Sequence, residues 1–357
     1  MSFGSDNWAG TTDRVMSVLA EANEGLAPAY GHDSWTGRAR DLLSEQFQTD
    51  VAAFFVGTGT AANSLSLAQY ARPGGIALCH PDAHVGGDEA GAPHLFSAGL
   101  QIDPVDGPAG RIAPRALSER LSRFTGNVHH GRPVAVSIAN VNELGQCYST
   151  ADVAEIAAIA RRYGCAVHMD GARFVNALAR TGASPADLTW RAGVDVLSLG
   201  LTKCGAWCAE AVILFDTKLR EDFSFRQMQA AQLFSKSRFV AAQFVAMLED
   251  NHALGLAAHA NGMADRIAAT MRGSAEASLL LEPQANEVFA YLAPQAAERL
   301  RAAGIAFAPW QVRSAHIAPP PHADWTLSRF IASFRTTEAE IDALAAALGH
   351  APAAANA

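Results

Sequence analysis

The chain has 357 residues, half of them (50%) hydrophobic, and its 27 basic against 35 acidic residues give a formal net charge of −8. This length exceeds the size at which a single hydrophobic core stops growing, so we expect more than one domain. The charge balance argues against nucleic acid or anionic lipid as a partner. No apolar run is long enough to span a bilayer, the N-terminal segment does not have the pattern of a secretory signal, and the five cysteines form no C-x-x-C pair. We therefore expect a soluble cytoplasmic protein without a disulfide framework.

Short apolar runs alternate with stretches of helical period along the first two thirds of the chain. The runs that predict strands are 51–56, 76–80, 133–139, 165–170, 194–200 and 210–215. Between them lie helical stretches such as 149–164, where Ser149 and Asp152 predict a capping box. Because the strand runs are continuously apolar, they indicate a mostly parallel central sheet with helices on both faces, which is an α/β fold.

The pattern changes after about residue 245. It predicts a long helix over 251–272, then strands and helices of mixed order, and a final helix that begins at Thr337 with Glu340 as its capping-box partner. We expect a large domain over 1–245, including an N-terminal arm, and a smaller α+β domain over 246–350. The tail 351–357 has nothing to bury and is expected to be disordered.

Two polar residues follow successive predicted strands. Asp170 lies at the end of the strand in 165–170, and Lys203 lies in the turn after 194–200. Each alone has an ordinary explanation, because such an Asp can cap a helix and such a Lys can simply be solvated. Together they would lie on one edge of a sheet, which suits pyridoxal phosphate. This cofactor needs a lysine for its imine and an acid beside its ring nitrogen.

A small-residue loop and a histidine complete this predicted edge. Residues 57–61, Gly-Thr-Gly-Thr-Ala, follow a strand and open a helix, so their backbone N–H groups could hold a phosphate. The loop could equally be an ordinary strand-to-helix turn. His84, beyond the strand at 76–80, could stack on the cofactor ring or be a packing histidine.

These segments, in chain order, resemble the threonine aldolase and β-eliminating lyase family, fold type I pyridoxal-phosphate enzymes. The resemblance is closest to bacterial low-specificity L-threonine and phenylserine aldolases. It rests on Ser5-Asp6-Asn7, Tyr30-Gly31-His32-Asp33, Gly59-Thr60-Ala61-Ala62-Asn63, His84, His168-Met169-Asp170-Gly171-Ala172-Arg173, Lys203 and Arg329. The segment ending in Arg173 is the most specific of these.

The resemblance implies a role for each matching residue. Lys203 would carry the cofactor as a Schiff base, Asp170 would pair with the pyridine nitrogen, and Gly59 and Thr60 would hold the phosphate. His84 would stack on the ring. Substrate would be bound through its carboxylate by Arg173 and Arg329, with Ser5 and Tyr30 nearby. It also implies a homodimer or homotetramer with active sites at subunit interfaces, where Lys236 or Arg238 of a neighbouring subunit offers a cation to the phosphate.

The chain departs from the family at one point. Many members have a histidine that contacts the β-hydroxyl of the substrate, whereas the corresponding stretch here is Asn140-Val141-Asn142-Glu143-Leu144-Gly145. Asn142 or Glu143 could contact substrate instead. The general base is thus open, with His84 as the first candidate. No histidine or cysteine spacing indicates a metal site.

The expected activity is cleavage of β-hydroxy-α-amino acids, such as L-threonine, L-allo-threonine or phenylserine, to glycine and an aldehyde. The main alternative is another pyridoxal-phosphate reaction, such as β-elimination, transamination or racemisation, since fold alone does not separate them. A nucleotide-binding oxidoreductase is disfavoured because residues 57–63 lack the G-x-G-x-x-G pattern. A non-catalytic scaffold is disfavoured because Lys203, Asp170, Arg173 and Arg329 occur together.

Overall fold

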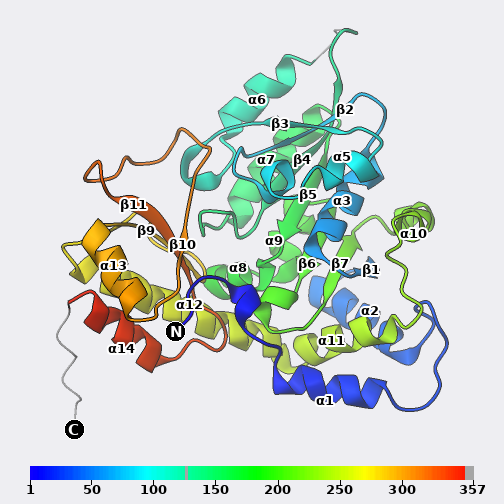
Figure 1. The fold of residues 1–357 in the computed structure, drawn as a ribbon. Coiled ribbons are helices and arrows are strands. Elements are labelled where there is room, and N and C mark those ends of the chain that lie inside the picture. The colour runs from blue at the N-terminus through cyan, green and yellow to red at the C-terminus, as the bar shows by residue number, and fades with distance from the viewer. Residues whose placement is uncertain (125–127, 350–357) are drawn as a thin grey trace.

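A seven-stranded sheet forms the centre of the protein (Figure 1). The computed structural model describes residues 1–124 and 128–349, so the tail predicted to be disordered lies outside them. The strand order is β1-β7-β6-β5-β4-β2-β3. The strands are β1 (Ala52–Val56), β2 (Gly75–Cys79), β3 (Gln101–Pro104), β4 (Arg132–Ala139), β5 (Ala166–Gly171), β6 (Val196–Gly200) and β7 (Glu210–Leu214). The six predicted strands are confirmed, whereas β3 was missed because this edge strand is not continuously apolar or buried.

The sheet is parallel except at β7, which pairs antiparallel with both β1 and β6. The mostly parallel sheet expected from the sequence is thus confirmed, and β7 is its exception. The connection 201–209 between β6 and β7 is too short for a parallel crossover, which needs about a dozen residues or more. The six remaining strands run the same way, so β1, β5 and β6 end at one edge.

Helices cover both faces of this sheet (Figure 1). Phe54 and Phe55, neighbours in β1, lie in separate cores on opposite faces, as alternation along a strand requires. One face packs against α3 (Gly59–Tyr70) and α10 (Arg220–Gln229). The other packs against α2 (Ser34–Phe47), α6 (Pro114–Ser122), α7 (Thr150–Arg162), α8 (Phe174–Thr181) and α11 (Arg238–Leu248). Shorter or peripheral helices are α1 (Asp13–Ala22), α4 (His84–Gly87), α5 (Ala92–Phe96) and α9 (Pro185–Leu188).

A second, antiparallel sheet of order β10-β11-β9-β8 lies beside the first. Its strands are β8 (Ala277–Leu279), β9 (Glu287–Leu292), β10 (Ala308–Pro309) and β11 (Thr326–Ile331). It packs with α12 (His252–Gly273), α13 (Pro294–Ala302) and α14 (Glu338–Ala347) around its own core. The mixed C-terminal order expected from the sequence is confirmed, and Ser2 of the N-terminal arm adds an isolated parallel bridge to Ala306, just before β10.

The predicted helix signals form as expected. Ser149 and Asp152 make a reciprocal capping box at α7, and Thr337 and Glu340 make another at α14. The boundary at residue 245 stays a prediction, and α11 runs through that position. Phe3, from the N-terminal arm, packs in the core of the small sheet, so the N-terminus and α14 both lie beside that sheet (Figure 1).

Candidate active site

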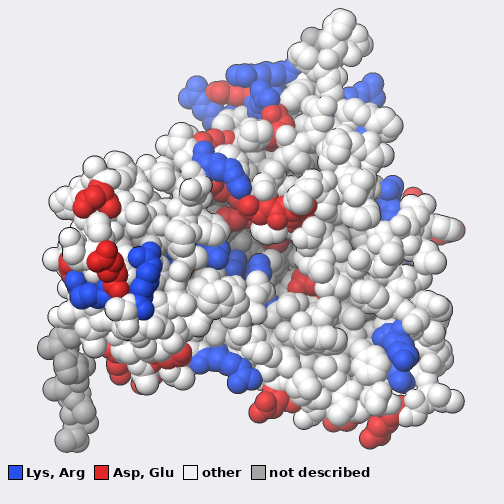
Figure 2. Space-filling model, in the orientation of Figure 1, with Lys and Arg blue, Asp and Glu red and all other residues white. Residues whose placement is uncertain are grey.

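A cavity of about 560 Å³ opens where β1, β5 and β6 end, and the small sheet closes its opposite side. On the face drawn in Figure 2, acidic and basic side chains meet around the hollow near the centre. Most of the predicted site residues line this cavity. They are Ser5, Gly59, Thr60, His84, Asn142, Glu143, Asp170, Arg173, Lys203 and Arg329.

Asp170 and Lys203 meet at the cavity floor because their strands are neighbours. Asp170 pairs in register with Ser198 of β6, and Lys203 lies in the short helix that follows the same strand, Thr202–Cys204. The carboxylate of Asp170 accepts hydrogen bonds from Asn63 Nδ2 at 2.7 Å and from the Ala172 amide at 2.9 Å. These bonds fix the acid at the position that the sequence predicted.

The N-terminus of α3 lies at the cavity, where the phosphate cradle was predicted. Thr58 caps the helix by accepting a hydrogen bond from the Ala61 amide at 3.1 Å, which leaves Gly59 and Thr60 facing the cavity. A Cβ on Gly57 would lie 3.0 Å from the Phe234 ring, so the backbone approaches its neighbours closely here. Free amides at the start of a 12-residue helix suit a phosphate group.

His84 is the first residue of α4 and is held by two carboxylates. Its ring Nδ1 lies 2.9 Å from Glu89 Oε1, and its amide donates to Glu143 Oε1 at 2.7 Å. The hydrogen bond to Glu89, helped by the nearby charge of Asp170, raises the pKa of His84 against the opposing effect of burial. With Nδ1 engaged, Nε2 is the ring nitrogen available to a molecule in the cavity.

Glu89 links His84 to the acid on the floor. Asn63 Nδ2 donates both to Glu89 Oε1 at 2.8 Å and to Asp170 at 2.7 Å. The side chain of Glu89 is fully buried, whereas that of His84 is 42% exposed, so the network runs from the protein interior to the open side of the cavity. The two predicted groups, Asp170 and His84, therefore belong to one fixed network.

Glu143 and Asn142 occupy the stretch where the family histidine is absent. Asn142 uses its amide in its own turn, where Oδ1 accepts from the Leu144 and Gln146 amides and Nδ2 donates to Ala109 O, each at 3.0 Å. Glu143 keeps partial exposure into the cavity. Burial and the charge of Asp170 raise the pKa of Glu143 to about 7. The geometry thus favours Glu143 over Asn142 as the residue with free capacity.

Arg173 is already surrounded by carboxylates. Its Nε and Nη2 donate to the two oxygens of Asp6 at 2.7 and 3.1 Å, and its Nη1 lies 3.2 Å from Glu287 Oε2. Burial alone would raise the pKa of Asp6, but the ion pair with Arg173 lowers it below its ordinary value. Likewise, burial would lower the pKa of Arg173, but Asp6 and Glu287 raise it. This arginine fastens the N-terminal arm beside the cavity.

Arg329, on β11 of the small sheet, has unfilled capacity. Its guanidinium carbon lies 4.0 Å from the centre of the Trp310 ring, while Glu287 Oε1 is 3.9 Å and Gly4 O is 3.5 Å away. Its Nε is buried without a partner in the described chain. Burial lowers the pKa of Arg329 despite the attraction of Glu287. Such a guanidinium suits an incoming carboxylate.

Three predicted residues do not line this cavity. Tyr30 is exposed with φ of 58°, in the left-handed region, and its amide donates to Ser235 O at 3.0 Å. Lys236 is the next residue along and is exposed, and Arg238 begins α11. Tyr30 and Lys236 therefore lie together on the surface, away from the cavity of their own chain.

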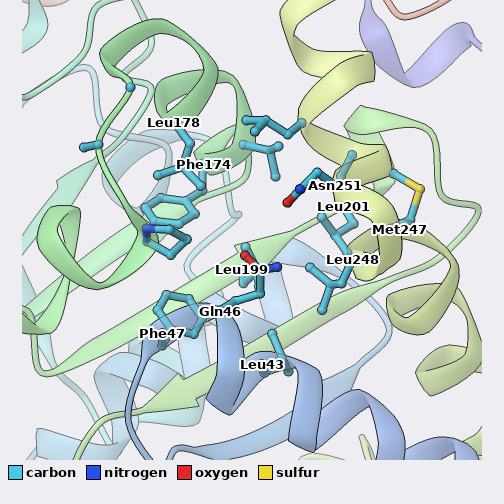
Figure 3. Close-up of a pocket in the computed structure, with 16 residues that line it drawn as sticks. Leu43, Gln46, Phe47, Phe174, Leu178, Leu199, Leu201, Met247, Leu248 and Asn251 are labelled. Carbon is cyan, nitrogen blue, oxygen red and sulfur yellow. The ribbon is translucent and has the colours of Figure 1, made fainter.

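A second, apolar cavity of about 200 Å³ lies between α2, α8 and the junction of α11 with α12 (Figure 3). Leu43, Phe47, Phe174, Leu199 and Leu201 form much of its wall. The polar side chains that line this cavity are those of Gln46 and Asn251, and none of its lining residues is an acid or a base. Within the described part of the chain, no three His, Cys, Asp or Glu residues group as a metal site.

Sequence reasoning missed four residues of the site. Glu89 and Glu210 lie near predicted motifs, and Glu287 and Trp310 come from the second half of the chain. An acid at the start of an apolar strand indicates a functional site, because a buried charge is costly unless it is paired. Glu210 at β7 and Glu287 at β9 both have this position. Trp310 carried no such signal, because only folding brings it against Arg329.

The residues present fit pyridoxal phosphate. Lys203 could supply the amine, Asp170 the acid for the ring nitrogen, and the start of α3 the phosphate cradle, all at one sheet edge. This arrangement matches the rule that ligands bind at the carboxyl ends of the strands in open α/β sheets.

Comparison with known proteins identifies the family. The model of the β-eliminating lyase family matches residues 2–295. The chain is 41% identical to the low-specificity L-threonine aldolase of Pseudomonas aeruginosa, over 85% of this chain and 88% of that protein. It is 38% identical to the enzyme of the same name from Pseudomonas sp. strain NCIMB 10558, over 96% of each. A Leishmania major threonine aldolase structure shares the fold with a TM-score of 0.89, at 23% identity over 98% of each chain. The resemblance, the fold class and the cofactor predicted from the sequence are confirmed, and the chain belongs to the β-eliminating lyase family of pyridoxal-phosphate-dependent enzymes.

Proposed function

We propose that this protein cleaves L-threonine, L-allo-threonine and related β-hydroxy-α-amino acids, including phenylserine-like ones, to glycine and an aldehyde. The observation that carries the proposal is the cavity itself. It holds Lys203, Asp170 and His84 on the large-sheet side and the unfilled guanidinium of Arg329 on the small-sheet side. The names of the two Pseudomonas relatives support the same substrate class.

Bound pyridoxal phosphate supplies an electron sink for the pair released when the Cα–Cβ bond breaks. Lys203 would hold the cofactor through its amine, and Asp170 would lie beside the ring nitrogen and keep it protonated. Arg329 holds the substrate carboxylate, with Arg173 and Ser5 beside it, so that the bond to be broken is correctly oriented.

A base must take the proton of the β-hydroxyl as the aldehyde leaves. His84 is the first candidate, because Glu89 holds Nδ1 and leaves Nε2 toward the cavity. Glu143 is the second, since it lies beside His84 and faces the same space. A proton returned to Cα then gives glycine.

The experiment is an absorbance scan of the purified protein followed by L-allo-threonine with coupled detection of acetaldehyde. A visible cofactor band together with acetaldehyde and glycine in equal amounts supports the proposal. A band with ammonia and a keto acid instead would assign the protein to β-elimination, and a keto acid without ammonia would assign it to transamination. No band after addition of pyridoxal phosphate would contradict the role of Lys203.

The oligomeric state and location belong to the same proposal. The protein would form a homotetramer or a homodimer. Either assembly would place Tyr30 and Lys236 or Arg238 of one subunit at the cavity of another. Their joint position on the surface supports this. Exposed Trp8, Leu26 and Trp207 offer apolar area for such contacts. Five free cysteines support a cytoplasmic location, and no helix of residues 1–124 and 128–349 has the length and apolarity to span a membrane.

A further inference from the structure

Glu210 lies between the phosphate cradle and Lys203. It is the first residue of β7, whose antiparallel direction places that end at the edge where β1 and β6 finish. Its Cα pairs with Val56 of β1 and with Gly200 of β6. The cradle follows β1 and Lys203 follows β6, so the topology inserts a carboxyl group between the two.

The carboxyl of Glu210 reaches the cradle. A Cβ on Gly59, the first residue of α3, would lie 3.8 Å from Glu210 Oε2, and a Cβ on Gly200 would lie 2.7 Å from the same atom. Gly200 therefore leaves room for this side chain, and the start of α3 lies in ordinary contact distance of it. Glu210 is 7% exposed and lines the cavity together with Gly57, Thr58, Gly59 and Thr60.

This acid is buried without a matched cation. Among the residues that the structure describes, it takes part in no ion pair, and its hydrogen-bond partner is Thr202. The charged or titratable groups that face it are Lys203, Asp170 and Cys208. Burial raises the pKa of Glu210 to about 7, although Thr202 and Lys203 oppose the shift.

A phosphate bound at the start of α3 would bring further negative charge against this carboxyl. Two neighbouring anions repel each other strongly when they are shielded from water. A neutral carboxylic acid would remove the repulsion and could donate a hydrogen bond to a phosphate oxygen. The ionised and the neutral carboxyl of Glu210 differ by one proton.

We propose that Glu210 is a cofactor-binding residue that is protonated when the phosphate of pyridoxal phosphate occupies the cradle, so that binding takes up a proton at its carboxyl group. The inference concerns cofactor binding and does not depend on which amino acid the enzyme cleaves. Glu210 ionises near neutral pH before binding, and the bound phosphate raises its pKa further. Affinity for the cofactor therefore falls as pH rises above about 7, by up to about tenfold per pH unit.

The test is titration calorimetry of the apoprotein with pyridoxal phosphate at pH 8, in two buffers of different ionisation enthalpy. At this pH the free cofactor phosphate is already fully ionised, since its second pKa is about 6. The wild-type protein should take up as much as one proton more per site than Glu210→Gln, whose amide can donate at every pH. The Kd of the variant should also rise less steeply between pH 7.5 and 9 than that of the wild type.

Pyridoxal, which lacks the phosphate, is the matched ligand control. It still forms the imine with Lys203, so the wild type and the Glu210→Gln variant should differ in proton uptake with pyridoxal phosphate but not with pyridoxal. Equal uptake in both proteins with pyridoxal phosphate would overturn the proposal. If the variant does not fold, the wild-type protein alone decides, because proton uptake should then be greater with pyridoxal phosphate than with pyridoxal. Equal uptake with the two ligands would again overturn it.

Discussion

The two arginines of the cavity show how differently its two sides are built. Arg173, on the large-sheet side, is saturated by Asp6 and Glu287 at 2.7–3.2 Å. Arg329, on the small-sheet side, has a ring at 4.0 Å and no carboxylate closer than 3.9 Å. The family resemblance predicted that both arginines bind the carboxylate of the substrate. These contacts show that Arg173 is a fixed support of the cavity, whereas the guanidinium of Arg329 has unused hydrogen-bond donors.

The walls as a whole do not divide so sharply. On the large-sheet side, Asp170, Asn63, Glu89 and His84 are connected by hydrogen bonds of 2.7–2.9 Å. Buried polar atoms without a partner in the described residues occur on both sides, Asn63 Oδ1 and Glu89 Oε2 on the first and Arg329 Nε on the second. Arg329 is the cationic group among these three, so it is the one suited to the carboxylate of a substrate.

The largest effect should come from the large-sheet side, at Lys203. Lys203→Ala should abolish the visible absorbance of the cofactor linked to this residue and lower kcat by on the order of 10⁴-fold or more, as loss of a covalent catalytic group does. Absorbance spectra and acetaldehyde release measure both. Lys218→Ala, at an exposed lysine, is the control and should keep both signals. Retained absorbance in Lys203→Ala would mean that another lysine carries the cofactor.

Arg329→Gln should come next and should act on substrate rather than cofactor. A buried hydrogen-bonded carboxylate pair contributes about 1.5–3 kcal/mol, so kcat/KM should fall by about 10- to 150-fold, mainly through a higher KM. The cofactor spectrum should not change. Arg301→Gln removes an arginine stacked on Phe307 at the surface and is the matched control. If both variants show the wild-type KM, Arg329 does not hold the carboxylate.

Trp310→Ala should have a smaller effect through the position of Arg329. A desolvated cation–π contact contributes about 1–2 kcal/mol, which corresponds to about a 5- to 30-fold loss in kcat/KM. Trp310→Phe keeps an aromatic face and should recover most of the lost kcat/KM. The readout is binding of glycine against binding of glycinamide, because only glycine has a carboxylate. A loss that is equal for both ligands would show that Trp310 acts on the fold alone.

The smallest effect should be a change in pH dependence at His84. Glu89 raises the pKa of His84, and a base works only above its pKa, so kcat/KM of the wild type should fall as pH drops through this raised value. Glu89→Gln removes the charge, lowers the pKa of His84 and should move the acid limb of the profile to lower pH. Glu143→Gln tests the other candidate. If the acid limb disappears in Glu143→Gln and is unmoved in Glu89→Gln, Glu143 is the base.

The sequence by itself determined the sheet, most of its strands and the residues at its active edge. Asp170 and Lys203 were predictable because continuous apolar runs favour parallel strands, and residues that follow neighbouring parallel strands share one edge of the sheet. The capping boxes at Ser149 and Thr337 were predictable because their hydrogen bonds span only a few residues.

Only the tertiary structure decided which of these groups remain available. Glu89, Glu287 and Trp310 reach the site through contacts between distant segments, and their partners set the hydrogen-bonding capacity of His84, Arg173 and Arg329. The direction of β7, which brings Glu210 to the phosphate cradle, depends on a short connection and on pairing with β1 far away in the chain. Residue type and local period specify what a side chain can do, whereas burial and long-range neighbours specify its charge and its free hydrogen bonds.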